Sequence, residues 1–415
     1  MKFKPLTSPA AMMFLLFFLL GNSLFAQVRP HHIFDNNMVL QRDQPVKIWG
    51  WANPSEQIKV EFGGQLKSTQ ANQQGEWFTH LDPMKANTKA QNMKIAGKVD
   101  AVVFTNVLVG DVWVLGGQSN MEMDLSRLFH GDAEVLSAHF PSIRLMTIPS
   151  SAGQLPKKDF ERINEYDSWN DRYDKKGYWF TCSPSTVETF SGLGYIFGRR
   201  LHLVSQVPIG LIDASLGGTT VEAWLSPKTL NTMPENNALV KQWNDKEAAY
   251  DPVEDLKTKI TNWEKRSLVL KSQGLEPAPK PVEPSLRPSL DRNFPGSSYT
   301  GMVALIGGLS VKGAVFHQGY NNALGDARPK LYAANYKALI NDWRELFNNK
   351  NLPFGIMELS AGGEPQTLDN YELRMLDAAP AIREGQFNAF RDLPNTGYAA
   401  AYDQQVNWYH PQKKV

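Results

Sequence analysis

The fold is decided by one stretch, Asp111-Val112-Trp113-Val114-Leu115-Gly116-Gly117-Gln118-Ser119-Asn120-Met121. An apolar run typical of a buried strand leads into two glycines and a serine, and a helical segment follows. Ser119 is thereby predicted at the carboxyl end of a central strand, where open α/β sheets bind ligands. The glycines allow a tight turn, which leaves the Ser119 N–H free to face an oxyanion. Taken alone, the pattern fits a nucleophile and a helix-capping serine equally well.

The rest of the chain after residue 106 repeats this alternation of strands and helices. Apolar strand-like runs occur at 107–115, 209–214, 311–316, 352–358 and 397–402. Helical periodicity is clearest at 190–204, 332–347 and 368–390. Alternating strands and helices predict an α/β fold, with a parallel sheet covered by helices.

Two other regions differ in pattern from this α/β part. Short alternating runs at 46–51, 57–62 and 66–76, separated by turn residues, predict a small antiparallel β domain over 27–106. The α/β domain then extends over 107–415. An insertion at about 227–295, with a charged helix at 255–272 and a proline-rich run at 277–281, is predicted to lie on its surface.

Residues 1–26 have the pattern of a signal peptide. Lys2 and Lys4 precede an apolar run at 10–20, and small residues follow up to Ala26. The apolar run is about half of the roughly 20 residues that a membrane span needs, so an integral membrane protein is not expected. An uncleaved anchor is the alternative. The pattern predicts a periplasmic or secreted protein that begins near Gln27.

The composition excludes several classes of partner and site. Lysine and arginine number 43 against 42 acidic residues, so no basic face for nucleic acid is predicted. Cys182 is the only cysteine, which excludes an internal disulfide and a thiolate metal site. Its neighbours suggest no activation, so it is predicted to be a small core residue.

Two further segments follow predicted strands, as Ser119 does. They read Asp213-Ala214-Ser215-Leu216-Gly217-Gly218-Thr219 and Phe316-His317-Gln318-Gly319-Tyr320-Asn321-Asn322. Because the carboxyl ends of parallel strands meet at one edge, all three segments are expected to converge. The glycines offer backbone N–H groups and the other loop offers side-chain amides, which are the donors of an oxyanion hole.

The last predicted strand is followed by Asp403 and, seven residues later, by His410. An acyl-transfer enzyme with a serine nucleophile needs an imidazole to take the proton and a carboxylate to hold its tautomer. His410 and Asp403 can supply that pair. A lone histidine near a chain end is more often a surface residue, so the interpretation depends on the other three segments.

Taken together, the motifs resemble those of the sialate O-acetylesterases, within the SGNH hydrolases. The similarity covers essentially the whole chain after the signal peptide. It is carried by the opening 34–42 and by four later blocks, Gly117-Gln118-Ser119-Asn120-Met121, Gly217-Gly218-Thr219, Gln318-Gly319 with Asn322-Ala323, and His410-Pro411 with Lys413.

The resemblance implies a flavodoxin-like sheet, a Ser/His/Asp site without metal or other cofactor, and hydrolysis of acetyl esters on sugars, sialic acid first among them. It makes Ser119 the nucleophile and His410 the base. The oxyanion and substrate donors would come from Gly217 or Gly218 and from Gln318 or Asn322, with Gln118 beside the nucleophile.

The chain departs from the family pattern at three places. Tyr320 stands where the family usually has a glutamate, and Asn407 stands where many SGNH enzymes have the aspartate that orients the histidine. Asp403 is therefore preferred as the orienting acid, because a carboxylate stabilises the imidazolium, and Asn407 is the alternative. The sequence stops at Val415 without the family's closing helix, which favours a truncated gene product.

Two other functions are compatible with this sequence. One is an acetyl esterase for a plant polysaccharide such as xylan or pectin, and the other is a sugar-binding protein on a degenerate esterase scaffold. Trp179, Trp224 and Trp408 are candidates for a sugar platform, although core packing is the more frequent role of such residues.

Overall fold

The computed structural model describes residues 27–150, 157–167, 172–324, 328–360, 367–369, 378–401, 404 and 410–412. Within these ranges the chain forms two compact units. The first comprises Ile48–Leu81, Met93–Val103 and the described residues up to His31. The second comprises His32–Lys47, Asp82–Asn92 and the described residues from Phe104 onward. The predicted signal peptide lies outside the described residues.

The first unit is built from antiparallel strands. β1 (Arg29–Pro30), β3 (Val46–Trp51) and β6 (Glu76–Leu81) form one sheet, while β4 (Gln57–Phe62) pairs with β5 (Gln65–Gln70) and with the end of β7 (Asn87–Ala96). Gly63 and Gly64, with φ of 59° and 77°, form the left-handed two-residue turn between β4 and β5. Alternate residues of β4 are buried, so one face of the hairpin supplies the core. The predicted antiparallel sheet is confirmed, while the predicted domain bounds 27–106 stay a prediction.

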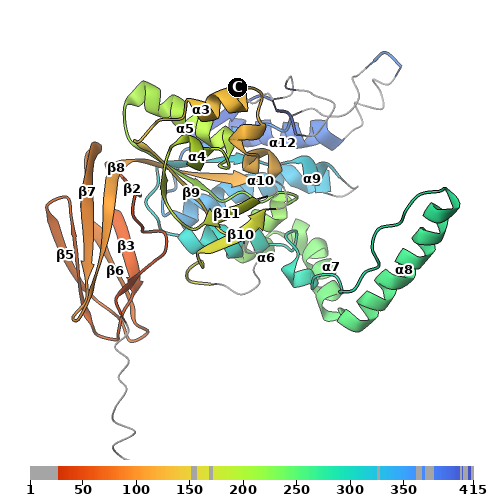
Figure 1. Ribbon diagram of the computed structural model, residues 1–415, viewed down its shortest axis with the longest axis horizontal. Coiled ribbons are helices and arrows are strands. Elements are labelled where there is room, and N and C mark those ends of the chain that lie inside the picture. The colour runs from red at the N-terminus through yellow and green to blue at the C-terminus, as the bar shows by residue number, and fades with distance from the viewer. Residues whose placement is uncertain are drawn as a thin grey trace, which may run out of the picture. The chain divides into compact units, whose positions relative to one another are not determined.

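The second unit contains a parallel sheet (Figure 1). Its strands run in the order β12-β9-β13-β8-β14-β15-β16. They span, in chain order, β8 (Ala101–Gly117), β9 (Ile143–Thr147), β12 (Phe180–Thr181), β13 (Ile209–Asp213), β14 (Gly313–His317), β15 (Phe354–Met357) and β16 (Thr396–Ala399). The two-residue edge strand β12 is antiparallel to β9, and β2 (Val39–Gln41) adds a parallel pairing to β8. The predicted α/β fold is confirmed.

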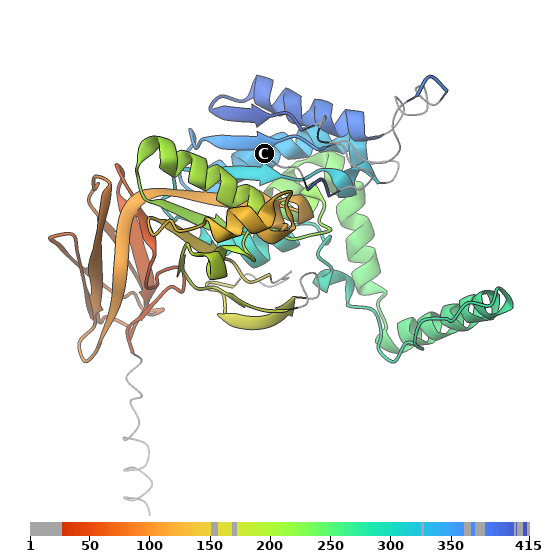
Figure 2. The same cartoon turned by 45° about the horizontal axis from the view of Figure 1, so that its top comes forward.

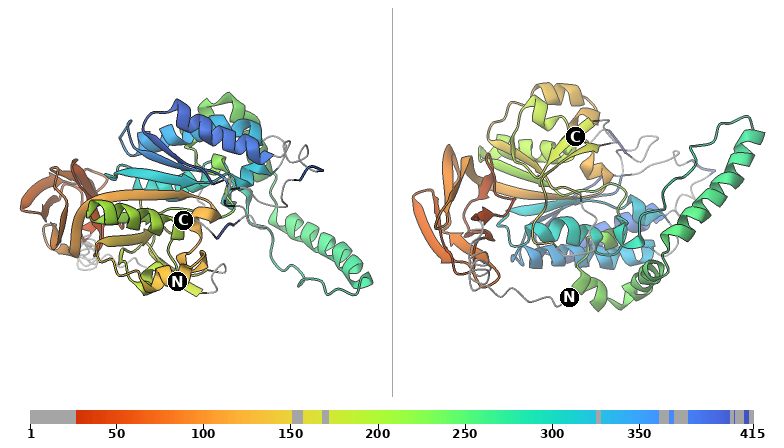
Figure 3. Two further views of the ribbon diagram at one scale, coloured as in Figure 1. Left: turned by 90° about the horizontal axis from the view of Figure 1, so that it is seen from above. Right: turned by 60° about the horizontal axis from the view of Figure 1, so that its bottom comes forward.

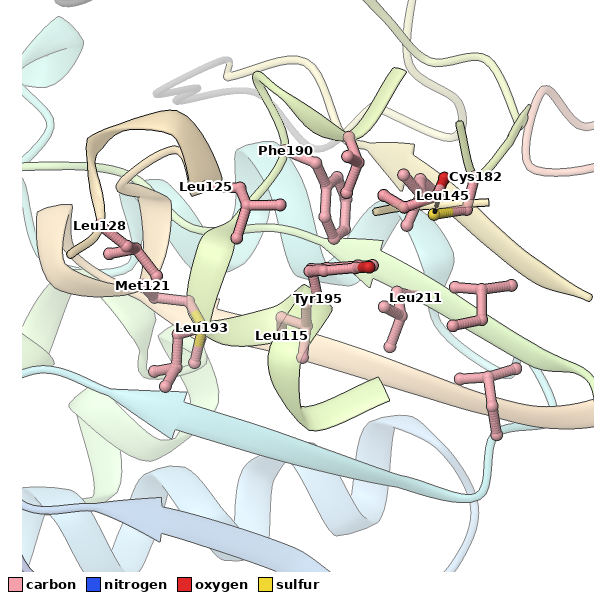
Figure 4. Close-up of a cluster of buried hydrophobic side chains, with 14 of the residues drawn as sticks. Leu115, Met121, Leu125, Leu128, Leu145, Cys182, Phe190, Leu193, Tyr195 and Leu211 are labelled. Atoms are coloured by element: carbon pink, nitrogen blue, oxygen red, sulfur yellow. Dashed lines mark hydrogen bonds between the residues drawn. The ribbon is translucent and has the colours of Figure 1, made fainter. Parts of the chain in front are cut away.

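Helices cover both faces of this sheet. A side chain at Gly116 would meet Trp343 of α10 (Arg328–Leu346), whereas the neighbouring Leu115 packs on α5 (Gly192–Ser205). Successive residues of a strand point to opposite faces, so α5 and α10 lie on opposite sides. The left view of Figure 3 shows this arrangement, with α12 (Ala378–Asp392) beside α10. The core between α5 and the sheet contains Leu145, Tyr195 and Leu211 (Figure 4).

The remaining helices are mostly short, and several occupy the predicted insertion. They are α2 (Ser119–Glu122), α3 (Gly131–Leu136), α4 (Pro184–Val187), α6 (Pro227–Thr232), α7 (Asn237–Ala248), α8 (Pro252–Ser272) and α9 (Tyr320–Ala323). α8 begins after Asp251, whose carboxylate accepts the N–H groups of Val253 and Glu254. The segment after α8 runs back along it (Figure 2), and Trp263 Nε1 donates to the Ala278 carbonyl across 2.6 Å.

Most predicted elements of the α/β part match the structure, and the differences include one helix and several unpredicted strands, β9 to β12. Of the helix predicted over 368–390, the described part is α12 from Ala378 on, and Leu368 and Asp369 lie in a turn. Strand β9 was not predicted, because the buried Arg144 interrupts its apolar run. The guanidinium donates to the carbonyls of Asn37 and Asn106, each 3.0 Å from Nη1, and burial lowers the pKa of Arg144 to about 10.

Among the described helices, none combines the length and apolarity required to cross a bilayer.

Candidate active site

The turn from β8 into α2 places Ser119 at the carboxyl edge of the sheet. Gly117 has φ of +130°, and a Cβ there would lie 2.1 Å from the carbonyl oxygen of His317 on the next strand. Only glycine allows this approach. Ser119 is the first residue of α2, so its N–H has no acceptor within the helix. Of the residues that follow, Met121 (Figure 4) and Met123 are both buried in the core.

His410 meets Ser119 across 291 residues of sequence. Its Nε2 lies 2.6 Å from Ser119 Oγ, and the two residues are 2% and 8% exposed. The backbone just after His410 is held by the Phe129 N–H, which donates to the Gln412 carbonyl across 2.9 Å. The predicted orienting residues Asp403 and Asn407 lie outside the described residues.

The second predicted segment lies directly against Ser119. Strand pairing sets Asp213 opposite Leu115, and a Cβ on Gly217 would lie 3.4 Å from Ser119 Cβ. The Gly217 N–H donates to Glu122 Oε2 across 2.7 Å, so a carboxylate already occupies one of the predicted oxyanion donors. Gly218 has φ of +74° and also lines the cavity described below.

In the third predicted segment, the two predicted donors are buried and do not line the cavity. The predicted donors Gln318 and Asn322 are 1% and 0% exposed, and the Gln318 amide donates to Asn322 Oδ1 and to the Thr219 carbonyl. Asn322 in turn donates to both oxygens of the buried Glu222 at 3.0 and 3.1 Å and accepts the Val221 N–H. Both amides therefore bind the 217–222 loop, and their predicted role as oxyanion donors stays a prediction.

Asn321, which was not among the predicted site residues, lies with its amide at the wall of the site. Its Nδ2 donates to the Gly218 carbonyl at 2.8 Å, and its Oδ1 accepts from Gln118 Nε2 at 3.1 Å. Gln118 also accepts the Gly319 N–H. The amide of Gln118 thus ties the Ser119 turn to the third segment, and its predicted role as an oxyanion or substrate donor stays a prediction.

A cavity of about 600 Å³ opens over Ser119 and His410. Its described walls include Glu122, Glu165, Tyr166, Lys176, Arg292 and Asn321. Glu165 and Tyr166 belong to β10 (Ile163–Asp167) and Lys176 to β11 (Arg172–Lys176), which form an antiparallel hairpin. Lys176 Nζ lies 2.5 Å from Glu165 Oε1, so these two charges pair with each other.

An adjoining cavity of about 350 Å³ shares Glu122, Ser150 and Lys176 with the first. At its base burial raises the pKa of Asp213 to about 6, although Ser215 Oγ and the Ser215 N–H both donate to the same carboxylate oxygen. The acidic lining of this second cavity was not predicted, since its residues come from separate segments that carry no shared motif.

The other residue types singled out by sequence have structural positions. Cys182 is buried in the core beside α5, and burial raises the pKa of its thiol to about 12, as expected of an unreactive thiol. Trp179 and Trp224 are buried at 3% and 0% exposure, and Trp408 lies outside the described residues. Within the described part of the chain, no three His, Cys, Asp or Glu side chains are placed to hold a metal ion.

Comparisons with known proteins agree with the motif resemblance. No protein-family model matches the chain. It is 28% identical over 380 residues to mouse sialate O-acetylesterase and 26% identical over 397 residues to the human protein of the same name, which covers 87% and 89% of this chain. It spans 64% of the length of each relative.

Among solved structures, a carbohydrate acetylesterase from Xanthomonas citri is similar in fold. The TM-score is 0.71 at 24% identity, and the match covers 94% of this chain and 72% of the other. The predicted resemblance of this chain to the sialate O-acetylesterase family is thereby confirmed.

Proposed function

We propose that this chain is a serine esterase that hydrolyses O-acetyl esters on sugars. The observation that carries the proposal is the 2.6 Å contact between Ser119 Oγ and His410 Nε2 at the floor of an open cavity. A hydroxyl at the end of a parallel strand, bonded to a buried imidazole, is the arrangement that acyl transfer requires. The names of the relatives support acetylated sugars as the substrate class.

In the proposed reaction His410 takes the proton of Ser119 as Oγ attacks the acetyl carbonyl carbon. The tetrahedral intermediate collapses when the sugar oxygen leaves with that proton, and an acetyl ester remains on Ser119. Water, deprotonated by His410, then attacks the acetyl group, and acetate departs as Ser119 regains its proton. Every proton in the cycle passes through His410 Nε2.

The oxyanion of each intermediate would be stabilised by the N–H of Ser119 and by a glycine N–H of the second segment. Because Glu122 accepts the Gly217 N–H, the acetyl oxygen must displace that carboxylate if Gly217 is the donor, whereas Gly218 would act without displacement. We assign Gln318 and Asn322 a positioning role through the 217–222 loop, and Asn321 is the amide that lines the cavity.

Asp403 is proposed as the carboxylate that orients His410, with Asn407 as the neutral alternative. The mechanism calls for no metal or organic cofactor.

Sialic acid is the favoured sugar because the relatives are named for it, and an acetylated plant polysaccharide is the alternative substrate. The pattern of residues 1–26 favours action in the periplasm or outside the cell.

The test is hydrolysis of a chromogenic acetyl ester by the purified chain and by Ser119→Ala. We expect turnover by the wild type, a loss of at least about a thousandfold in the variant, and little change in Tm. Ser137→Ala, which alters an exposed serine on α3's C-terminal side, is the matched control and should retain full activity. One tenth of wild-type turnover in Ser119→Ala would exclude Ser119 as the nucleophile. A folded wild type that binds sugars without turnover would instead indicate a degenerate binding protein.

A further inference from the structure

We infer that Arg292 binds the carboxylate of an acidic sugar and so makes the enzyme selective for acetylated sialic acids over neutral sugars. The inference rests on the proposed function and names a residue that would determine its specificity. Arg292 lies at the returning end of the insertion, far in sequence from Ser119, and its side chain is exposed at the wall of the Ser119 cavity.

The guanidinium lies beside the candidate oxyanion loop. Its Nη1 donates to the Gly217 carbonyl at 2.7 Å, and its Cδ lies 3.5 Å from where a Cβ of Gly218 would be. Gly217 also packs against Ser119, so the arginine and the nucleophile contact the same residue. Both side chains also line the same cavity, so a single sugar bound there would lie against both groups.

The backbone around Arg292 is fixed to the same loop. The Asn293 amide donates to the Gly218 carbonyl at 2.9 Å and accepts the Thr220 N–H at 2.8 Å, and the Gly296 N–H donates to the Glu222 carbonyl at 3.0 Å. These bonds hold the start of the side chain in place before substrate arrives, which lowers the entropic cost of binding.

Two cationic side chains, Arg292 and Lys176, line this cavity, and they differ in their ion pairs. Lys176 is paired with Glu165 at 2.5 Å, whereas no described carboxylate forms an ion pair with Arg292. An arginine has five N–H donors in a planar fork that matches a carboxylate, and the Gly217 carbonyl is the acceptor found for them in the described structure. Arg292 lines the open cavity, where a sugar carboxylate can take two of the remaining donors.

The experiment compares acetate release from O-acetylated N-acetylneuraminate with release from the same sugar carrying a carboxamide in place of the carboxylate. We expect the wild type to prefer the acid in kcat/KM. Arg292→Gln should reduce this preference by about 10- to 100-fold, the range of a hydrogen bond to a charged group, and Arg292→Lys should retain part of it. Arg287→Gln removes a charge from the same insertion, outside the cavity, and should leave the preference unchanged.

A second arm measures binding of N-acetylneuraminate to Ser119→Ala with and without Arg292→Gln, which requires no turnover. The added change should weaken binding by a similar factor. An equal preference for acid and carboxamide in the wild type, or an unchanged preference in Arg292→Gln, would overturn the role of Arg292. Failure of the proposed function is seen separately, as no hydrolysis of the chromogenic ester, and the binding arm then still decides whether Arg292 holds a carboxylate.

Discussion

The floor and the rim of the Ser119 cavity are built in different ways. The floor residues Gln118, Ser119 and His410 are between 2% and 8% exposed, and the first two follow directly from the end of β8. The rim comes from the hairpin β10–β11 and from the end of the insertion. Tyr166 of β10 is 51% exposed, and Arg292 of the insertion also lies at the surface.

This difference separates the reaction from the choice of substrate. Gln118 and Ser119 cannot move without shifting the end of the buried strand β8, which costs packing energy in the core. A rim residue belongs to a surface segment that tolerates changes in length and sequence. We therefore expect floor variants to change the chemical step or stability, and rim variants to change the preference among sugars.

The largest expected effect concerns the partner of His410. If Asp403 orients the imidazole, Asp403→Asn should lower kcat by about 10⁴-fold, the scale seen when a triad aspartate is made neutral. Asn407→Ala should cost far less. Steady-state kinetics of both folded variants on one chromogenic ester decide the matter. The opposite ranking would assign the role to Asn407 and leave a triad without a carboxylate.

A smaller effect is expected from the buried support of the floor. Asn322→Ala removes two donors to the Glu222 carboxylate and the acceptor of the Val221 N–H, so the free energy of unfolding should fall by about 2–4 kcal/mol. Activity should fall as the 217–222 loop shifts. Urea unfolding measures the first effect, and Tyr166→Ala at the rim is the control, with a change below about 0.5 kcal/mol.

The same variant separates two roles for Asn322. If it were an oxyanion donor and not a support, kcat would fall by about 10²-fold or more with stability nearly unchanged. A loss of stability accompanied by a modest loss of activity agrees with the positioning role proposed above.

The smallest expected effect is that of a metal chelator. Acetyl ester hydrolysis should be unchanged after treatment with chelator and removal of bound ions, because the proposed mechanism draws its nucleophile from Ser119 and its base from His410. Activity assays before and after dialysis give the comparison. Loss of activity that only zinc restores would contradict the proposed mechanism and would indicate a metal ion at the floor of the cavity.

Much of the floor could be predicted from the sequence because local signals determine it. The apolar run before Gly116 predicts a buried strand, and the glycines predict the turn that presents Ser119. Parallel strands place their carboxyl ends at one edge, so the sequence predicts the segments of Gly217 and Gln318 at the same edge as Ser119. His410 required the motif resemblance as well, since no periodicity links it to Ser119.

Contacts between distant segments were decided only by the tertiary structure. Side-chain packing across segments places Glu122 on the Gly217 N–H and the Asn321 amide at the wall of the cavity. The same packing buries Gln318 and Asn322. It also brings Arg292 to the cavity from an insertion that was expected to lie only on the surface. Strand and turn patterns depend on residues that are neighbours in the sequence, so they can be predicted from the sequence directly. Which amide turns inward, and which side-chain charge has no ion pair among the described residues, depends on the space and the partners left by residues up to hundreds of positions away.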